Sequence, residues 1–142
     1  MSISVFIIDD HPLFSRGLSQ LIETKKDFNV IGIANNRTQA LEFISSKIPD
    51  LVILDLNLGK EDGLEVLKEI LYINSKIKVL VLSMHDERFY AERAIKAGAK
   101  GYIMKEEAEA KVLDAISSVA EGKIYLRSEE HTSELQSLAY LV

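Results

Sequence analysis

The sequence contains no cysteine, no tryptophan and only two prolines among its 142 residues. Without cysteine there is no disulfide framework, no thiolate zinc site and no cysteine nucleophile. The three histidines, His11, His85 and His131, lie far apart in the sequence, which disfavours a histidine-rich metal site. Apolar residues, which make up 47% of the chain, must supply the core, and a chain of this length buries enough surface to fold on them alone.

Positive charge is also scarce, with 17 lysines and arginines against 22 acidic residues and a net charge of −5. A domain that binds nucleic acid directly presents a basic face to the phosphates, and this balance does not indicate one. The opening residues MSISVFIIDD lack the basic start of a signal peptide, and their apolar run is too short to cross a membrane. We therefore expect a cytoplasmic protein with one main domain and no membrane partner.

Short apolar runs alternate with stretches of helical spacing along most of the chain. The strand-like runs are 3–8, 28–34, 51–54, 77–82 and 101–104. The helical patterns lie within 14–22, 40–44, 64–71, 91–95 and 112–120. Pro12 suits a first helical turn, and Gly98 and Gly122 suit helix ends. The alternation predicts a parallel α/β sheet with helices on both faces.

Polar residues stand where four of the five predicted strands end. They are Asp9 and Asp10 after the first strand, Asp55 and Asn57 after the third, Ser83 after the fourth and Lys105 after the fifth. Right-handed crossovers bring the carboxyl ends of parallel strands to one edge, so these side chains are expected to lie together. Carboxylates suit Mg²⁺, a hydroxyl and a lysine can stabilise a phosphoryl group, and an aspartate can accept one.

Each of these residues also has an ordinary structural explanation. A single aspartate after a strand commonly caps a helix or a turn, and Asp9 and Asp10 could cap the helix that follows them. Ser83 could simply begin a loop, and Lys105 could be an exposed surface lysine. The occurrence of acid, acid, hydroxyl and lysine in this order favours one shared site over separate explanations.

The motifs IIDDHP, LVILDLNLGKEDG, VLSMH and GAKGYIMK resemble the receiver domain of bacterial two-component response regulators. The resemblance covers about residues 3–122 and is strongest to the subfamily with a LuxR-type helix-turn-helix output domain. It implies a flavodoxin-like (βα)5 three-layer sandwich with strand order 2-1-3-4-5. It also implies a receiver domain over residues 1–122 that works as a phosphorylation-activated switch and is not a classical enzyme.

The resemblance assigns a role to each candidate site residue. Asp55 would accept a phosphoryl group from a sensor histidine kinase, with Ser83 and Lys105 binding the phosphoryl oxygens. The Mg²⁺ cofactor would be held by Asp9, Asp10, Asp55 and the backbone carbonyl of Asn57. Tyr102 matches the switch aromatic that responds to movement of Ser83, and residues 91–102 would form the readout face. Control of transcription and a homodimer formed on phosphorylation are further expectations.

Two positions depart from the family pattern. Many receivers have a proline in a cis peptide after the lysine, where this chain has Glu106. A cis peptide before a residue other than proline costs about 3–4 kcal/mol, so none is assumed. The segment from Gly59 to Gly63 also lacks the proline that often stiffens the loop after the phosphoacceptor.

Residues 123–142 fall outside the receiver pattern. Their stretch RSEEHTSELQS (127–137) is polar and carries only a faint helical signal, as in a linker stub that leads to an output domain. The same stretch resembles a translated sequencing-library adapter, which favours an artefactual end. We expect no output domain in this chain, so DNA contact would need a C-terminal domain beyond it. The alternative is a stand-alone receiver or phosphorelay carrier that acts on a protein partner.

Other protein classes fit the sequence less well. A phosphatase of the haloacid-dehalogenase type needs a general acid two residues after its nucleophile, where this chain has Asn57. A flavin- or nucleotide-binding domain would need a glycine-rich phosphate loop, and neither G-x-G-x-x-G nor G-x-x-x-x-G-K-[ST] occurs. A receiver that serves only as an interaction module would lack the acid, the hydroxyl or the lysine, and all three are present.

Overall fold

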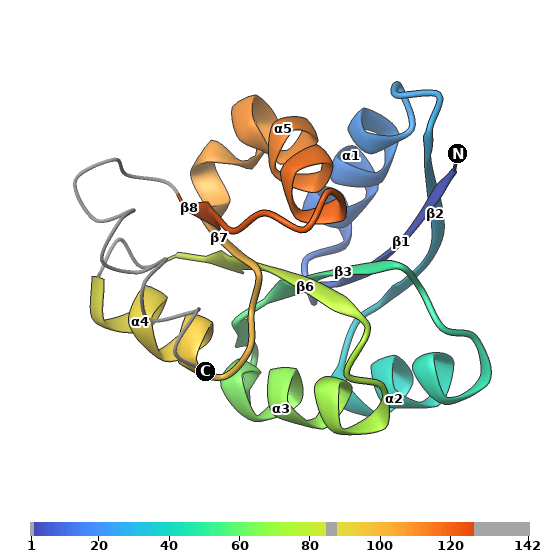
Figure 1. Ribbon diagram of the computed structural model, residues 1–142. Helices are drawn as coiled ribbons and strands as arrows, with labels where there is room; N and C mark the ends of the chain where they lie inside the picture. Colours follow the sequence, from blue (N-terminus) through green and yellow to red (C-terminus); the bar gives the residue numbers. More distant parts are fainter. Residues whose placement is uncertain (1, 85–87, 127–142) are drawn as a thin grey trace.

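A computed structural model describes residues 2–84 and 88–126 of the chain (Figure 1). Its larger sheet has the order β2-β1-β3-β6-β7-β8, and each neighbouring pair is parallel. The strands are β1 (Ile3–Ile8), β2 (Phe28–Ala34), β3 (Leu51–Asp55), β6 (Lys78–Ser83), β7 (Gly101–Met104) and β8 (Tyr125–Leu126). All five predicted strands are present, and the expected order 2-1-3-4-5 is confirmed by the first five strands of the sheet.

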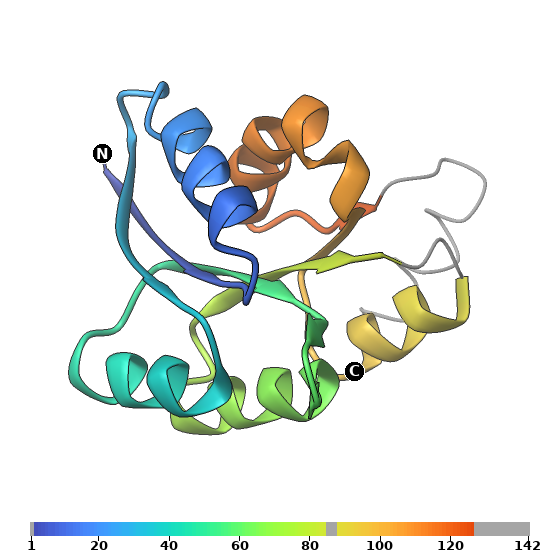
Figure 2. The same ribbon diagram turned by 180° about the vertical axis from the view of Figure 1, so that it is seen from behind.

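Helices cover both faces of this sheet (Figures 1 and 2). One face carries α1 (Pro12–Ile22) and α5 (Ala108–Ala120), and the other carries α2 (Arg37–Ser46), α3 (Gly63–Ile73) and α4 (Arg88–Lys96). A short 3-10 helix, η1 (Lys105–Glu107), joins β7 to α5. The flavodoxin-like three-layer architecture expected from the sequence is therefore confirmed.

The central strands are buried on both faces because their side chains alternate between two apolar layers. In β3, Val52 and Leu54 pack into the layer beneath α2, α3 and α4, whereas Leu51 and Ile53 pack into the layer beneath α1 and α5. Every residue of β3, including Asp55 at its end, is buried. A nearly unbroken apolar run is the pattern that such a strand requires.

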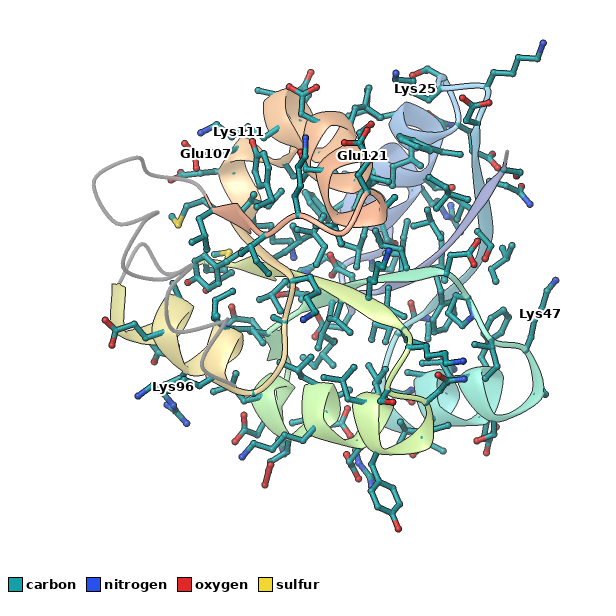
Figure 3. The ribbon with its side chains drawn as sticks, viewed as in Figure 1. Lys25, Lys47, Lys96, Glu107, Lys111 and Glu121 are labelled. Atoms are coloured by element: carbon teal, nitrogen blue, oxygen red, sulfur yellow. The ribbon has the colours of Figure 1, made fainter. Side chains whose placement is uncertain are left out.

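Helix boundaries follow the expected local signals. Pro12 occupies the first turn of α1, where its missing amide hydrogen leaves no hydrogen bond unmade. Gly98 and Gly122 follow α4 and α5 with φ angles of 112° and 90°, which a residue with a side chain rarely adopts. Charged residues such as Lys25, Lys47 and Lys96 extend from the periphery of the fold (Figure 3).

Two features of the described chain, a hairpin and a sixth strand, had no signal in the sequence. Strands β4 (Asn57–Leu58) and β5 (Glu61–Asp62) form a small antiparallel hairpin directly after Asp55, with Gly59 at a φ of 60° in its turn. Strand β8 extends the sheet beyond residue 122. The described backbone contains no cis peptide, so Glu106 follows Lys105 through a trans bond.

Two further expectations concern other parts of the chain. Within residues 2–84 and 88–126, no helix combines the length and the apolar character needed to cross a bilayer. The linker or adapter-like interpretation of 127–137 falls on residues outside the described part of the chain.

Candidate functional site

Four polar side chains from four strand ends are buried at the carboxyl edge of the sheet. Asp9 follows β1, Asp55 ends β3 and Ser83 ends β6, and all three are fully buried. Lys105 follows β7 and is 8% exposed. Polar groups at this depth need partners or a function, because burying a charge without either is costly.

Lys105 joins two of these buried carboxylates. Its Nζ lies 2.9 Å from Asp55 Oδ2 and 3.2 Å from Asp9 Oδ2, and it stands 4.6 Å from the centre of the Phe14 ring. The ammonium group therefore offsets the charge of both acids, and the aromatic ring adds a cation–π contact. The solvated surface lysine considered from the sequence is excluded by this burial.

Asp55 is held at both carboxylate oxygens. Oδ2 pairs with Lys105, and Oδ1 accepts a hydrogen bond of 2.9 Å from the backbone N–H of Asn57. Burial raises the pKa of Asp55 above its usual value, although the hydrogen bonds from Lys105 and Asn57 oppose that rise. The structure thus presents an oriented carboxylate whose ionised form is less favourable than in water.

The hairpin after Asp55 is anchored to neighbouring elements. The side-chain oxygen of Asn57 accepts a bond of 3.4 Å from the backbone N–H of Met84, just after β6. Glu61 accepts a bond of 2.9 Å from the backbone N–H of Arg37 at the start of α2. The ideal Cβ position of Gly59 lies 3.4 Å from Asp10 Oδ2, so the turn approaches the acids closely. The loop that carries Asn57 is therefore fixed at the site without a proline.

His11 is a site residue that the sequence interpretation missed. It stands at the N-cap of α1 but makes no side-chain capping bond, and its Nδ1 turns towards the acids. Nδ1 lies 3.1 Å from Asp9 Oδ1, 3.0 Å from Asp10 Oδ1 and 3.8 Å from Asp55 Oδ2. The only sequence signal was its place directly after Asp10, which reads equally well as a helix start.

The cluster has the donor set of a divalent cation site. One ligand atom each from Asp9, Asp10, His11 and Asp55 lies within 4.8 Å of all the others. Among the described residues, Asp9 Oδ2 and Asp10 Oδ1 are buried oxygens without a hydrogen bond. Such an acidic pocket suits a hard cation because carboxylate oxygens supply both the compensating negative charge and the ligands. Asp9 Oδ2 lies 3.2 Å from Lys105 Nζ and Asp10 Oδ1 lies 3.0 Å from His11 Nδ1, and both oxygens could also contact a bound cation.

Ser83 lies on β6, which pairs with β3, and Tyr102 lies on β7, which pairs with β6. Asp55 pairs with Leu82 in the β3–β6 register, so Ser83 lies one residue beyond that pair. Tyr102 is 3% exposed and belongs to the buried cluster that includes Ala91 and Ala94 of α4. The structure therefore puts the hydroxyl at the site edge and the aromatic ring beneath α4.

Comparison with known proteins identifies a family and several relatives of this chain. The chain matches the family described as "Response regulator receiver domain" over residues 5–117. It is 33% identical over 124 residues to the transcriptional regulatory protein DegU of Brevibacillus brevis, covering 87% of this chain and 52% of that protein. It is 34% identical over 123 residues to the nitrate/nitrite response regulator NarL of Escherichia coli K12, covering 87% of this chain and 57% of that protein.

Solved structures agree with this match. A LuxR-family two-component response regulator from Aurantimonas sp. SI85-9A1 superposes with a TM-score of 0.86 at 27% identity, covering 96% of this chain and 97% of that one. The receiver domain of NarL from Mycobacterium tuberculosis superposes with a TM-score of 0.79 at 30% identity, covering 86% and 98%. The chain spans little more than half the length of the curated relatives quoted above. It belongs to the response regulator receiver domain family, and its relatives include regulators of the LuxR, NarL and DegU type.

Proposed function

We propose that this domain is a switch driven by phosphorylation of Asp55. The observation that supports the proposal most directly is the buried Asp55 carboxylate, held 2.9 Å from Lys105 Nζ at the edge where the other acids gather. A merely structural aspartate at a strand end would be expected at the surface, in contact with water. Asp55 instead is buried and faces the ammonium group of Lys105, in a site that its family uses for signalling.

The phosphoryl donor in this proposal is a phosphohistidine of a sensor histidine kinase. A carboxylate oxygen of Asp55 attacks the phosphorus, the P–N bond breaks, and its electron pair returns to the imidazole of the donor. The raised pKa of Asp55 makes its carboxylate a better nucleophile than a fully solvated one, provided it is ionised. Lys105 then pairs with a phosphoryl oxygen, and the Ser83 hydroxyl donates a hydrogen bond to another.

We assign the cation of this site to Asp9, Asp10 and Asp55, with the backbone carbonyl of Asn57 as a further ligand. When bound, Mg²⁺ would neutralise the charge that gathers on the phosphoryl oxygens during transfer. Asp9 and Asp10 each carry a buried oxygen without a hydrogen bond, which supports this assignment. Without a cation, the acids repel one another and any incoming phosphoryl group.

The new phosphoryl contacts would shift an equilibrium between inactive and active forms. Only interactions that differ between the two forms can do this, and a shift from 1:99 to 99:1 needs about 5.5 kcal/mol. Charge-assisted hydrogen bonds of about 1.5–3 kcal/mol each reach that sum with a few contacts. Movement of Ser83 would be followed by Tyr102, so the face formed by residues 91–102 is the expected readout surface.

The output of the switch is proposed to be transcription. The relatives named above are transcription or response regulators nearly twice as long as the matched segment, which leaves room in them for a second domain. We infer a cytoplasmic regulator whose DNA contact belongs to a C-terminal domain beyond this chain, with a homodimer formed on phosphorylation. Sequencing the locus past the codon for Leu126 tests this output, and a native stop codon there would favour a phosphorelay carrier.

Intact-mass measurement tests the phosphorylation itself. Incubation with acetyl phosphate and Mg²⁺ should add the mass of one phosphoryl group, and alkaline treatment should remove it, as expected for an acyl phosphate. Asp55→Ala should abolish the adduct. Asp50→Asn, which alters the exposed aspartate at the other end of the same strand, should retain it. An adduct that persists in Asp55→Ala would contradict the proposal.

A further inference from the structure

Lys105 makes one contact that the proposed phosphotransfer does not use. Phe14, in the first turn of α1, places the centre of its ring 4.6 Å from Lys105 Nζ. A cation within about 6 Å of a ring centre is attracted to the electron-rich face of the ring. Because Lys105 is only 8% exposed, this attraction acts largely out of water, where it is stronger than at a surface.

The ring differs in kind from the polar neighbours of the same ammonium group. Lys105 Nζ lies 2.9 Å from Asp55 Oδ2, 3.2 Å from Asp9 Oδ2 and 2.9 Å from His11 Nδ1. Each of these contacts needs an N–H of the ammonium group directed at one atom, and the group has three such donors. The Phe14 ring attracts the charge as a whole, so this contact persists when one donor turns from Asp55 to a phosphoryl oxygen.

The packing of α1 fixes the ring at this position. Phe14 packs against the apolar layer beneath α1 and α5, one helical turn before the buried Leu18. It also lines a hollow of about 340 Å³ between the two helices, which Ala108 and Glu109 of α5 line as well. The ring therefore borders both the buried ammonium group and this hollow. A smaller side chain would leave the lysine room to adopt other rotamers.

We propose that Phe14 is a positioning residue for phosphotransfer, which holds the Lys105 ammonium group against Asp55 before the transfer and against a phosphoryl oxygen after it. The inference rests on the proposed function and adds a residue that acts only through Lys105. A long lysine side chain has many rotamers, and restricting them beforehand reduces the entropy lost when the ammonium group binds the phosphoryl group.

Graded fluorination of Phe14 tests this role in the full chain. Fluorine withdraws electron density from the face of the ring and weakens its attraction for a cation, while the ring keeps nearly the same shape. Mono-, di- and trifluorinated phenylalanine at position 14 should slow adduct formation with acetyl phosphate and Mg²⁺ in successive steps. The trifluorinated ring should slow it by about threefold to tenfold. Urea denaturation checks that each variant is fully folded in the assay.

Phe28 provides the matched control. Its ring lies 6.0 Å from the ammonium group of Lys25, at the start of β2 and so at the amino edge of the sheet. The same fluorinated residues at position 28 should leave the rate of adduct formation unchanged. A rate that stays constant through the series at position 14 would show that Phe14 only packs, and would overturn the inference. Equal slowing at both positions would overturn it as well.

Nuclear magnetic resonance provides a readout that does not depend on phosphorylation. The ring current of Phe14 should shift the ε-methylene protons of Lys105 upfield, and Phe14→Leu should abolish that shift. Absence of the shift in the wild type would overturn the inference. If the wild type forms the adduct and fluorination has no effect, the proposed function stands and only the role of Phe14 fails. If the wild type forms no adduct, the proposed function fails and the role of Phe14 fails with it.

Discussion

Strand β3 has an aspartate at each end, and the two residues have opposite environments. Asp50, just before the strand, is exposed, and its Oδ2 accepts bonds of 2.8 and 3.1 Å from the backbone N–H and hydroxyl of Ser4. Its own N–H donates to the Ser4 hydroxyl at 2.9 Å. Asp55 is fully buried beside another carboxylate and one lysine.

The contrast separates a structural carboxylate from a functional one. At the amino end, neutral donors of Ser4 bind the Asp50 carboxylate and link β1 to β3. Asp50 is exposed, so its charge remains in contact with water. At the carboxyl end, Asp9 and Asp55 are both removed from water while a single lysine offsets their charge. Native proteins tolerate such an arrangement where a site needs reactive groups held ready, at some loss of stability.

The largest expected effect concerns the backbone that supports the buried end. An ideal Cβ on Gly63 would lie 2.5 Å from the backbone Cα and O of Leu56, the residue after Asp55. We expect Gly63→Ala to lower the free energy of unfolding by about 3 kcal/mol, since backbone atoms must shift to admit the methyl group. Urea denaturation measures this loss.

Gly17 provides the matched control for that substitution. It lies within α1, and nothing stands within 4 Å of its Cβ position. Gly17→Ala should raise the free energy of unfolding by about 0.5–1 kcal/mol, because alanine restricts the unfolded chain and favours helix. A similar small effect at Gly63 would mean that α3 does not pack on Leu56 as described.

The next effect compares two lysines at opposite edges of the sheet. Lys105→Met leaves the Asp9 and Asp55 carboxylates buried without their ion pairs and should cost about 2 kcal/mol at neutral pH. Lys78→Met, at the amino edge, loses only a bond of 2.9 Å to the carbonyl of Ala120 and should cost about 1 kcal/mol. Thermal unfolding of both variants checks the order, and adding Asp55→Asn to Lys105→Met should restore part of the loss.

The pH dependence of stability gives a third comparison. Asp55 has a raised pKa in the folded protein, chiefly because of burial, so the folded state binds this proton more tightly than the unfolded chain. Ionised Asp55 therefore destabilises the fold at neutral pH, and this penalty disappears as the pH falls from the raised pKa to the ordinary value of 3.8. Asp55→Asn should stabilise the protein by about 1 kcal/mol at pH 7 and by progressively less in acid.

Asp50→Asn serves as the control at the other end of the strand. Asp50 is exposed, and an asparagine can still accept from Ser4, so its stability should stay within about 0.5 kcal/mol of the wild type. Urea denaturation across the acid range measures both variants. A gain for Asp50→Asn that matches the gain for Asp55→Asn would remove the distinction between the two ends.

The fold could be predicted from the sequence because its main signals are strong and local. The apolar runs that form β1, β3 and β6 leave little alternative to a parallel, doubly covered sheet. The hairpin β4–β5 could not be predicted, since a pair of two-residue strands ending in Glu61 and Asp62 has no apolar pattern. Strand β8 could not be predicted either, because its pairing with β7 depends on tertiary contact.

The site was predicted from chain order and family motifs, and its weakest point was the direction of individual side chains. The strand ends placed Asp9, Asp55 and Lys105 at one edge, and the structure brings their charged atoms into contact. His11 was missed because a histidine before a helix can point to solvent or to the acids. The structure turns its Nδ1 towards Asp9 and Asp10.

The smallest expected effect tests whether the cost of losing an ion pair depends on burial and not on charge alone. Arg37 and Glu69 form a bidentate ion pair between α2 and α3 that is open to water. The hydrogen bond from Arg37 holds the pKa of Glu69 below its usual value, so this stabilisation is present above the ordinary glutamate pKa and is lost as the pH falls through the lowered one.

Arg37→Ala should therefore lower the thermal unfolding midpoint less than Lys105→Met does, because water and salt screen an exposed pair. The loss should shrink further in high salt and at acid pH, where Glu69 becomes protonated. Arg37→Gln is the matched variant, since it removes the charge but keeps a polar side chain, and both variants keep the backbone N–H that donates to Glu61. If Arg37→Ala costs as much as Lys105→Met in high salt, burial does not set the cost of charge at the carboxyl edge.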